Sequence, residues 1–118
     1  MIFHITSRTA WTEAQTKGEY TAPSLVTEGF IHCSTLSQVL PVANSYYAGQ
    51  AGLIVLAIEP ALLSSALKWE PPSGGAPPPG VPEGEMFPHI YGPVNLNAVV
   101  KAIELELNSN GTFTLPDL

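Results

Sequence analysis

The residues best suited to chemistry are the three histidines, each of which precedes a hydroxyl-bearing side chain by two positions. The pairs are His4 with Thr6, His32 with Ser34, and His89 with Tyr91. Side chains alternate between the two faces of a strand, so both members of each pair project from the same face. If the three segments form neighbouring strands, three imidazoles and three hydroxyls line one cleft. Arg8 and Glu28 are the charged residues nearest to the first two pairs.

Each of these residues also has a purely structural interpretation. A strand histidine is often half-buried and satisfied by a backbone carbonyl. Tyr91 then serves as a core residue with its hydroxyl at the rim, and Ser34 as a hydroxyl at a strand end. Arg8 is compatible with a surface position at a helix start, and Glu28 with a turn. Cys33 points to the opposite face from its neighbours, so we expect a buried small residue and not a nucleophile.

Other common kinds of site have little support in the sequence. The three histidines lack tight metal-ligand spacings such as HExxH, so no metal is expected. No Gly-x-Ser-x-Gly elbow surrounds Ser34, which argues against a Ser-His-acid triad. GxGxxG and Walker sequences are also missing, so the usual dinucleotide and triphosphate folds are not indicated.

Length and composition indicate one domain spanning residues 1–118. Hydrophobic residues make up 45% and charged residues 12%, which excludes a disordered acidic tail despite the net charge of −6. The four basic residues are scattered singly and cannot form the stripe that duplex nucleic acid requires. A single nucleotide needs far fewer cations.

The single cysteine excludes an internal disulfide and any cysteine-based zinc finger. The first residues lack the basic and apolar regions of a secretory signal. The longest apolar stretch, residues 53–58, is too short to cross a bilayer. We therefore expect a cytoplasmic protein without a membrane partner, and the oligomeric state stays open.

Hydrophobic patterning predicts about six strands and two or three short helices. Strands are expected at residues 2–6, 29–34, 53–58, 67–70, 102–107 and 112–115, with a strand-like centre in 87–93. A short helix is expected at residues 9–14, with Ser7 or Thr9 as its cap and Gly18 as its stop. A second helix is expected after a capping box at residues 35–38, up to about residue 47. Single helical turns are expected at 60–63 and 96–100. This pattern predicts an α+β fold with a mostly antiparallel sheet.

The connections carry their own signals. Residues 20–28 show no clear periodicity and are expected to form a loop. Residues 71–85 contain six prolines and four glycines, which predicts an exposed, mobile loop within one domain. The dipeptide Asn110-Gly111 is typical of a tight hairpin turn.

Several of these segments resemble a small uncharacterised family, domain of unknown function nine-fifty-two. The most specific are Gly29-Phe30-Ile31-His32-Cys33-Ser34 and Phe87-Pro88-His89-Ile90-Tyr91-Gly92-Pro93. The opening Phe3-His4-Ile5-Thr6 and the later Gly18-Glu19-Tyr20 also match. The resemblance spans roughly residues 2–100.

The resemblance implies a fold similar to the ADP-ribosyltransferases, in which two small sheets flank a cleft that binds NAD. It implies that His4 binds ribose or backbone around the dinucleotide, and that His32 or Ser34 faces the nicotinamide half. The implied catalytic residues are His89, Tyr91 and Ser34. The implied residues for an NAD or ADP-ribose-like cofactor are His4, Thr6, Arg8, Glu28 and His32, with Arg8 as the candidate for the pyrophosphate.

Three functional hypotheses follow. The first is a small enzyme that binds NAD or an ADP-ribose-type nucleotide and transfers an ADP-ribosyl group. The second is a non-catalytic module that binds such a metabolite, because active relatives usually place a glutamate where this sequence has His89 and Tyr91. The third is a protein-interaction domain that uses its acidic surface or the proline-rich loop.

Overall fold

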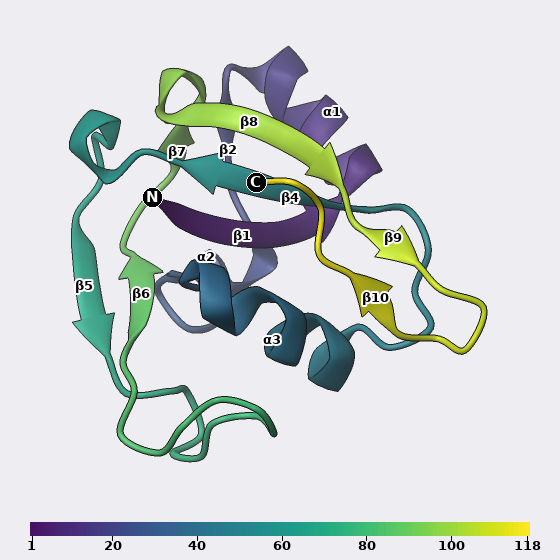
Figure 1. Cartoon of the computed structure of the whole chain (residues 1–118). Coiled ribbons are helices and arrows are strands. Elements are labelled where there is room, and N and C mark those ends of the chain that lie inside the picture. The colour runs from purple at the N-terminus through teal and green to yellow at the C-terminus, as the bar shows by residue number, and fades with distance from the viewer.

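The computed structural model describes all 118 residues and is built around a three-stranded antiparallel sheet. Its strand order is β1 (Ile2–Ser7), β4 (Leu53–Ile58) and β8 (Val99–Glu104). All six residues of the central strand β4 are buried, as its continuous apolar run predicts. We call this sheet the first sheet. It runs across the middle of Figure 1.

Each face of the first sheet is covered by a helix. Ile54 and Leu56 pack in one buried cluster, toward α1 (Arg8–Lys17). Val55 and Ala57 point the other way and pack with residues of α3 (Val39–Tyr46). Helix α3 lies beside β1, and α1 lies beyond β8 in the view of Figure 1. Strand alternation therefore divides one apolar run between two cores.

The ends of α1 follow directly from local sequence. The Ser7 hydroxyl accepts a hydrogen bond from the Ala10 N–H at 3.0 Å, which caps the first turn. Gly18 ends the helix in a left-handed conformation with φ of 93°, and its N–H donates to the Ala14 carbonyl at 2.8 Å. The predicted helix is confirmed and extends to Lys17.

The second predicted helix begins with the capping box. Residues Leu36–Gln38 form a 3₁₀ turn that leads into α3. Pro41 is tolerated because it lies in the first turn of α3, where its missing N–H removes little hydrogen bonding. Gln38 is fully buried, and its amide donates to Glu85 Oε1 at 2.8 Å and to the Met86 carbonyl at 3.0 Å. The box therefore also holds the end of the 71–85 loop.

A second sheet contains the strands β3 (Ile31–His32), β6 (Phe87–Ile90) and β5 (Leu67–Glu70), in that order. The two sheets meet at one isolated bridge, in which Ser34 donates to Phe3 at 2.7 Å and accepts from it at 2.8 Å. Strands β5 and β6 run across the direction of β1 in Figure 1. The sheets therefore touch along β1 and then separate.

Shorter elements complete the antiparallel arrangement. Two pairs of two-residue strands are β2 (Glu19–Tyr20) with β7 (Val94–Asn95), and β9 (Glu106–Leu107) with β10 (Phe113–Thr114). The second pair is the hairpin predicted from Asn110-Gly111. The 3₁₀ turns are η2 (Pro60–Leu62) and η3 (Leu96–Ala98), near the expected positions. No helix has the length and apolar character that a membrane crossing requires.

Four expectations need correction. The strand expected at 102–107 is interrupted at Leu105 and divided between β8 and β9, which belong to different sheets. The segment 20–28 contains helix α2 (Pro23–Thr27), which begins at a proline whose φ suits a first helical position. The expected strand 29–34 is reduced to the two residues Ile31 and His32. After them the Cys33 N–H still donates to the Pro88 carbonyl in the second sheet, whereas Ser34 pairs with Phe3 of the first sheet. The 71–85 loop lacks regular structure as predicted, but Pro78 and Val81 are buried, so it is only partly exposed.

The role of Gln38 can be tested by a stability measurement. We expect Gln38→Ala to lower the free energy of unfolding by about 2–4 kcal/mol, because it removes the cap, takes the donor away from two part-buried acceptors and leaves a gap where a fully buried side chain was. The control is Gln15→Ala, which removes an exposed glutamine of α1 and should change it by less than about 0.5 kcal/mol. Urea denaturation measures the free energy of unfolding of both variants. Equal changes in the two variants would contradict a structural role of Gln38.

Candidate functional site

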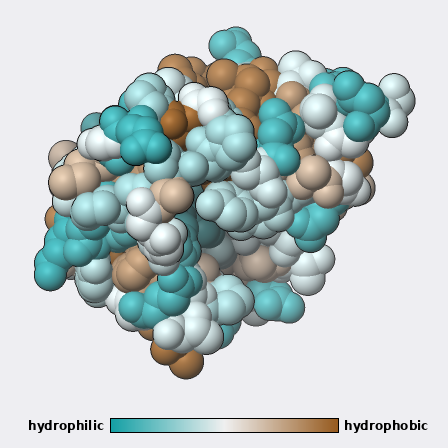
Figure 2. Space-filling model, turned by 90° about the horizontal axis from the view of Figure 1, so that it is seen from below, coloured by the Kyte–Doolittle hydropathy of each residue, from teal (hydrophilic) through white to brown (hydrophobic).

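A cleft of about 570 Å³ opens where β1 and β3 separate. Its walls come from β1, β3, α3 and the 71–85 loop, and they include all three histidines. Seen from below, the molecule shows mostly hydrophilic and intermediate residues around a central hollow, with hydrophobic patches nearer the rim (Figure 2). The volume lies in the range of small-molecule sites.

The edge of β1 presents backbone hydrogen-bonding groups to this cleft. The N–H and C=O of Phe3 both point away from β4, toward Ser34. Backbone groups alternate along an antiparallel strand, so those of Ile5 point to the same side. No bridge continues there, and Ile5 lines the cleft. Sequence reasoning missed this donor–acceptor pair, because it depends on where two strands part.

His4 lies on the cleft wall, but its ring atoms bond within the protein. Its Nδ1 lies 2.5 Å from the His32 carbonyl oxygen, and its Nε2 lies 2.7 Å from the Tyr20 hydroxyl. A carbonyl can only accept, so Nδ1 carries the proton and Nε2 accepts from Tyr20. Desolvation by burial lowers the pKa of His4 to about 4, so the ring is neutral.

The same network uses Thr6 and Tyr20. Their hydroxyls lie 2.9 Å apart, and burial raises the pKa of Tyr20 to about 12. The resemblance implied that His4 and Thr6 contact a cofactor. The structure instead commits the polar atoms of both to an internal chain that reaches the His32 carbonyl. A direct bond from the His4 ring to a ligand would require breaking this chain.

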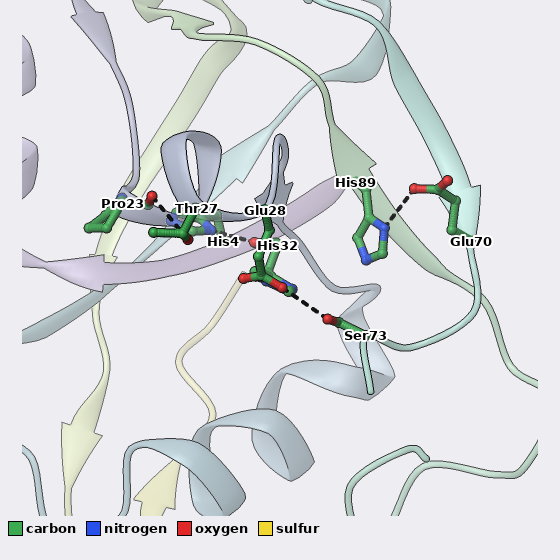
Figure 3. A network of polar contacts seen from close by, with 8 residues as sticks. All are labelled: His4, Pro23, Thr27, Glu28, His32, Glu70, Ser73 and His89. Carbon is green, nitrogen blue, oxygen red and sulfur yellow. Dashed lines mark hydrogen bonds and ion pairs between the residues drawn. The ribbon is translucent and has the colours of Figure 1, made fainter. Parts of the chain in front are cut away.

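His89 is held by a carboxylate that sequence reasoning missed. Its Nδ1 lies 2.8 Å from Glu70 Oε1, and the Tyr91 hydroxyl donates to the same oxygen (Figure 3 shows the His89–Glu70 contact). These two bonds, led by that from Tyr91, lower the pKa of Glu70, and the bond to Glu70 raises the pKa of Tyr91. Phe30 stacks on the imidazole with ring centroids 4.1 Å apart.

Two nearly buried residues of the cleft, Ser34 and His89, each leave a polar side-chain atom without a partner in the protein. His89 Nε2 and Ser34 Oγ make no hydrogen bond, although both residues are less than 6% exposed. No fully buried side-chain nitrogen or oxygen lacks a partner, so these two atoms reach the cleft surface. Tyr91 does not line the cleft. Cys33 is buried as expected, and desolvation raises the pKa of its thiol.

His32 belongs to a second histidine–carboxylate pair. Its Nε2 lies 2.8 Å from Glu28 Oε2, and the Ser73 hydroxyl donates to the other Glu28 oxygen at 2.9 Å (Figure 3). Both contacts, His32 first, lower the pKa of Glu28. His32 and His89 are direct partners across β3 and β6, and their ring centroids are 5.6 Å apart. Glu28 therefore links the second sheet to the 71–85 loop.

Arg8 does not join the other candidates. It forms an ion pair with Glu104 of β8 and does not line the cleft. The lining contains neither lysine nor arginine, so the expected arginine for a pyrophosphate is not there. No group of three or more histidine, cysteine, aspartate or glutamate side chains is arranged to hold a metal ion.

The far end of the cleft is aromatic. Tyr46 and Tyr47 at the end of α3 line it together with Val42 and Gln50. Tyr46 is exposed, whereas Tyr47 is half-buried and has a pKa raised by desolvation. Adjacent tyrosines at the end of a predicted helix are the sequence signal for this part of the cleft. Flat aromatic faces can stack on planar ligands.

These features define a small α+β domain with a cleft between two antiparallel sheets. Residues 5–102 match the family described as protein of unknown function (DUF952), and the chain belongs to that family. The resemblance found in the sequence is thereby confirmed as to the family. The likeness to the ADP-ribosyltransferase fold stays a prediction. No curated protein matches the chain.

Solved structures of the protein CC0527 from Caulobacter crescentus are similar to this chain. One crystal structure is 33% identical, with a TM-score of 0.81, and the match covers 97% of this chain and 93% of that one. A solution NMR structure is 34% identical, with a TM-score of 0.75, and the match covers 94% and 89%. The relationship therefore spans nearly the whole domain.

The neutral, buried state of His4 predicts how stability depends on pH. Its pKa is about 4 when folded and 6.5 when unfolded, so the unfolded chain binds more protons between these values. The contribution of His4 to the free energy of unfolding is therefore complete above pH 6.5 and is lost as the pH falls toward 4. From pH 7 to pH 5 we expect the free energy of unfolding to drop by about 2 kcal/mol on this account.

Comparison with His4→Gln isolates this effect, because glutamine can donate to the His32 carbonyl but does not titrate. Its pH dependence should be weaker than that of the natural protein by about 2 kcal/mol. The matched control is His32→Gln at an exposed histidine, which should keep the full drop. Urea denaturation at pH 7 and at pH 5 gives the free energy of unfolding of each protein. An equal drop between the two pH values in all three proteins would contradict a buried neutral His4.

Proposed function

We propose that the cleft binds NAD or an ADP-ribose-type nucleotide, with the nicotinamide end at the junction of the two sheets. The observation that carries this proposal is the unpaired backbone edge at Ile5, which opens into the same cleft as Ser34 and His89. On this free edge of β1, the backbone of Ile5 offers both an N–H donor and a C=O acceptor. A primary carboxamide such as that of nicotinamide has the complementary acceptor and donor.

The opposite end of the cleft suits the second base. Tyr46 and Tyr47 offer aromatic faces, and Gln50 offers an amide that can hydrogen-bond with a base edge. The cleft therefore combines aromatic and apolar walls with a small number of polar groups, as small-molecule sites usually do. A dinucleotide has two planar rings, and the cleft has one suitable surface at each end.

The phosphates of such a ligand would meet hydroxyls and backbone N–H groups, because no cation lines the cleft. Ser24 and Ser73 are available there, although Ser73 already donates to Glu28. Neutral donors bind phosphate less strongly than arginine does. We therefore expect modest affinity with little dependence on salt.

Transfer of the ADP-ribosyl group is the reaction that this ligand would allow. A non-catalytic binding module is the second candidate, and one observation favours it. Glu28 is the only carboxylate that lines the cleft, and it is already bonded to His32, as Glu70 outside the lining is to His89. Glu28 already has a hydrogen bond on each of its two oxygens, which makes it less available to the nicotinamide ribose.

An amide NMR titration with NAD and with ADP-ribose tests the binding. We expect saturable shifts at Ile5, Ser34 and His89 with NAD, and a smaller effect at Ile5 with ADP-ribose, which lacks the carboxamide. Tyr46→Ala should weaken binding of both ligands by about tenfold, through loss of stacking. The control Arg8→Ala lies outside the cleft and should bind like the natural protein. Spectra that do not change up to millimolar NAD would contradict the proposal.

A further inference from the structure

We propose that the Glu70–His89 pair is a general base that takes the proton of a hydroxyl acceptor, either water or an alcohol. The inference rests on the proposed function, because the acceptor attacks the ribosyl carbon of a bound NAD-type donor. It adds to that function the chemical class of the second substrate and the residue that activates it.

The first argument is the protonation pattern of His89. Glu70 Oε1 can only accept a hydrogen bond as a carboxylate, so Nδ1 of a neutral His89 carries the proton. Nε2 is then a bare acceptor. It has no partner in the protein and reaches the cleft surface. A carboxylate that fixes the tautomer of an imidazole in this way leaves it ready to accept a proton.

The second argument is rigidity. Phe30 stacks on the His89 ring at 4.1 Å, and the side chain is 3% exposed. The Tyr91 hydroxyl holds the Glu70 oxygen from the other side, so the carboxylate is itself fixed. A base placed in advance loses little freedom when the acceptor arrives, and such positioning is a main source of catalysis.

The third argument is charge. The titratable groups around His89 are His32 on β3, Glu70 and Lys68 on β5, Tyr91 just after β6, and Glu28 next to α2. Glu70 directly contacts the ring and stabilises the imidazolium that forms when Nε2 takes a proton. Lys68 lies over the Tyr91 ring, 4.7 Å from its centroid.

The reaction balances with the hydroxyl acceptor as the only co-reactant of the NAD-type donor. The bond between the ribosyl carbon and the nicotinamide nitrogen breaks, and its electron pair neutralises the positive ring. The acceptor oxygen forms the new bond to the carbon, and its proton passes to His89 Nε2 and then to solvent. Nicotinamide leaves as a neutral molecule and needs no acid. A carboxylate acceptor brings no proton and needs no base, so a base at this place favours an acceptor that carries a proton, and a hydroxyl is the one that we propose.

The test measures nicotinamide release from NAD, with water and then with added methanol as acceptor. We expect the natural protein to release nicotinamide faster at higher pH than at lower pH, because a general base must be unprotonated to act. Methanol should yield the methyl riboside of ADP-ribose alongside the hydrolysis product. His89→Gln should lower kcat by at least about 100-fold with little change in NAD affinity, and should abolish the pH dependence.

Glu70→Gln tests the positioning of the base. Glutamine can still accept from Nδ1 but cannot neutralise the imidazolium, so kcat should fall by about tenfold with an unchanged KM. The matched control is Glu13→Gln, which removes an exposed carboxylate of α1 and should leave kcat unchanged. If His89→Gln does not fold, unaltered kcat and pH dependence in Glu70→Gln would overturn the inference.

The outcomes separate this inference from the function on which it rests. Binding of NAD by NMR without nicotinamide release overturns the general base and leaves the binding site standing. Release that is equally fast in a folded His89→Gln protein overturns it as well. A protein that does not bind NAD at all overturns both. Release without any methanol product excludes an alcohol acceptor and restricts the acceptor to water.

Discussion

The hydrogen bond from His4 to the His32 carbonyl is the constraint on which the site depends. Beyond the Phe3–Ser34 bridge, β1 and β3 part, and this side-chain bond takes the place of a further backbone rung. Burial keeps the ring neutral, so its one ring proton points at the carbonyl and its other nitrogen accepts from Tyr20. Two sheets are thereby joined at an angle, with the backbone of Ile5 left open between them.

The second sheet then places the remaining polar groups by simple register. His32, His89 and Lys68 are successive partners across three antiparallel strands, so their side chains form one row on one face. Glu28 and Glu70 approach this row from different elements and each bonds one imidazole. The charges in the row are thus compensated locally, and the cleft lacks the excess positive charge that would favour a highly phosphorylated ligand.

Local patterns in the sequence predicted what depends on neighbours along the chain. The capping box, the cap and stop of α1, the buried strand β4 and the shared faces of the histidine pairs are all of this kind. The partners of those histidines were not predictable, because Glu70 and Tyr20 reach them through pairing of distant strands. The family resemblance implied Arg8 as the residue that meets a pyrophosphate in the cleft. The position of Arg8 at the helix start instead directs it to Glu104.

The three histidines show how position within a strand pair decides what an imidazole can do. Similar local sequences give His4 two internal partners, His32 an exposed ring beside a carboxylate, and His89 one partner with one nitrogen facing the cleft. Only the last arrangement combines a fixed tautomer with an accessible acceptor atom. His4 and His89 are both nearly fully buried. Burial alone therefore does not distinguish a histidine that only holds the fold together from one that can accept a proton from a ligand. The decisive difference is whether both ring nitrogens find partners inside the protein.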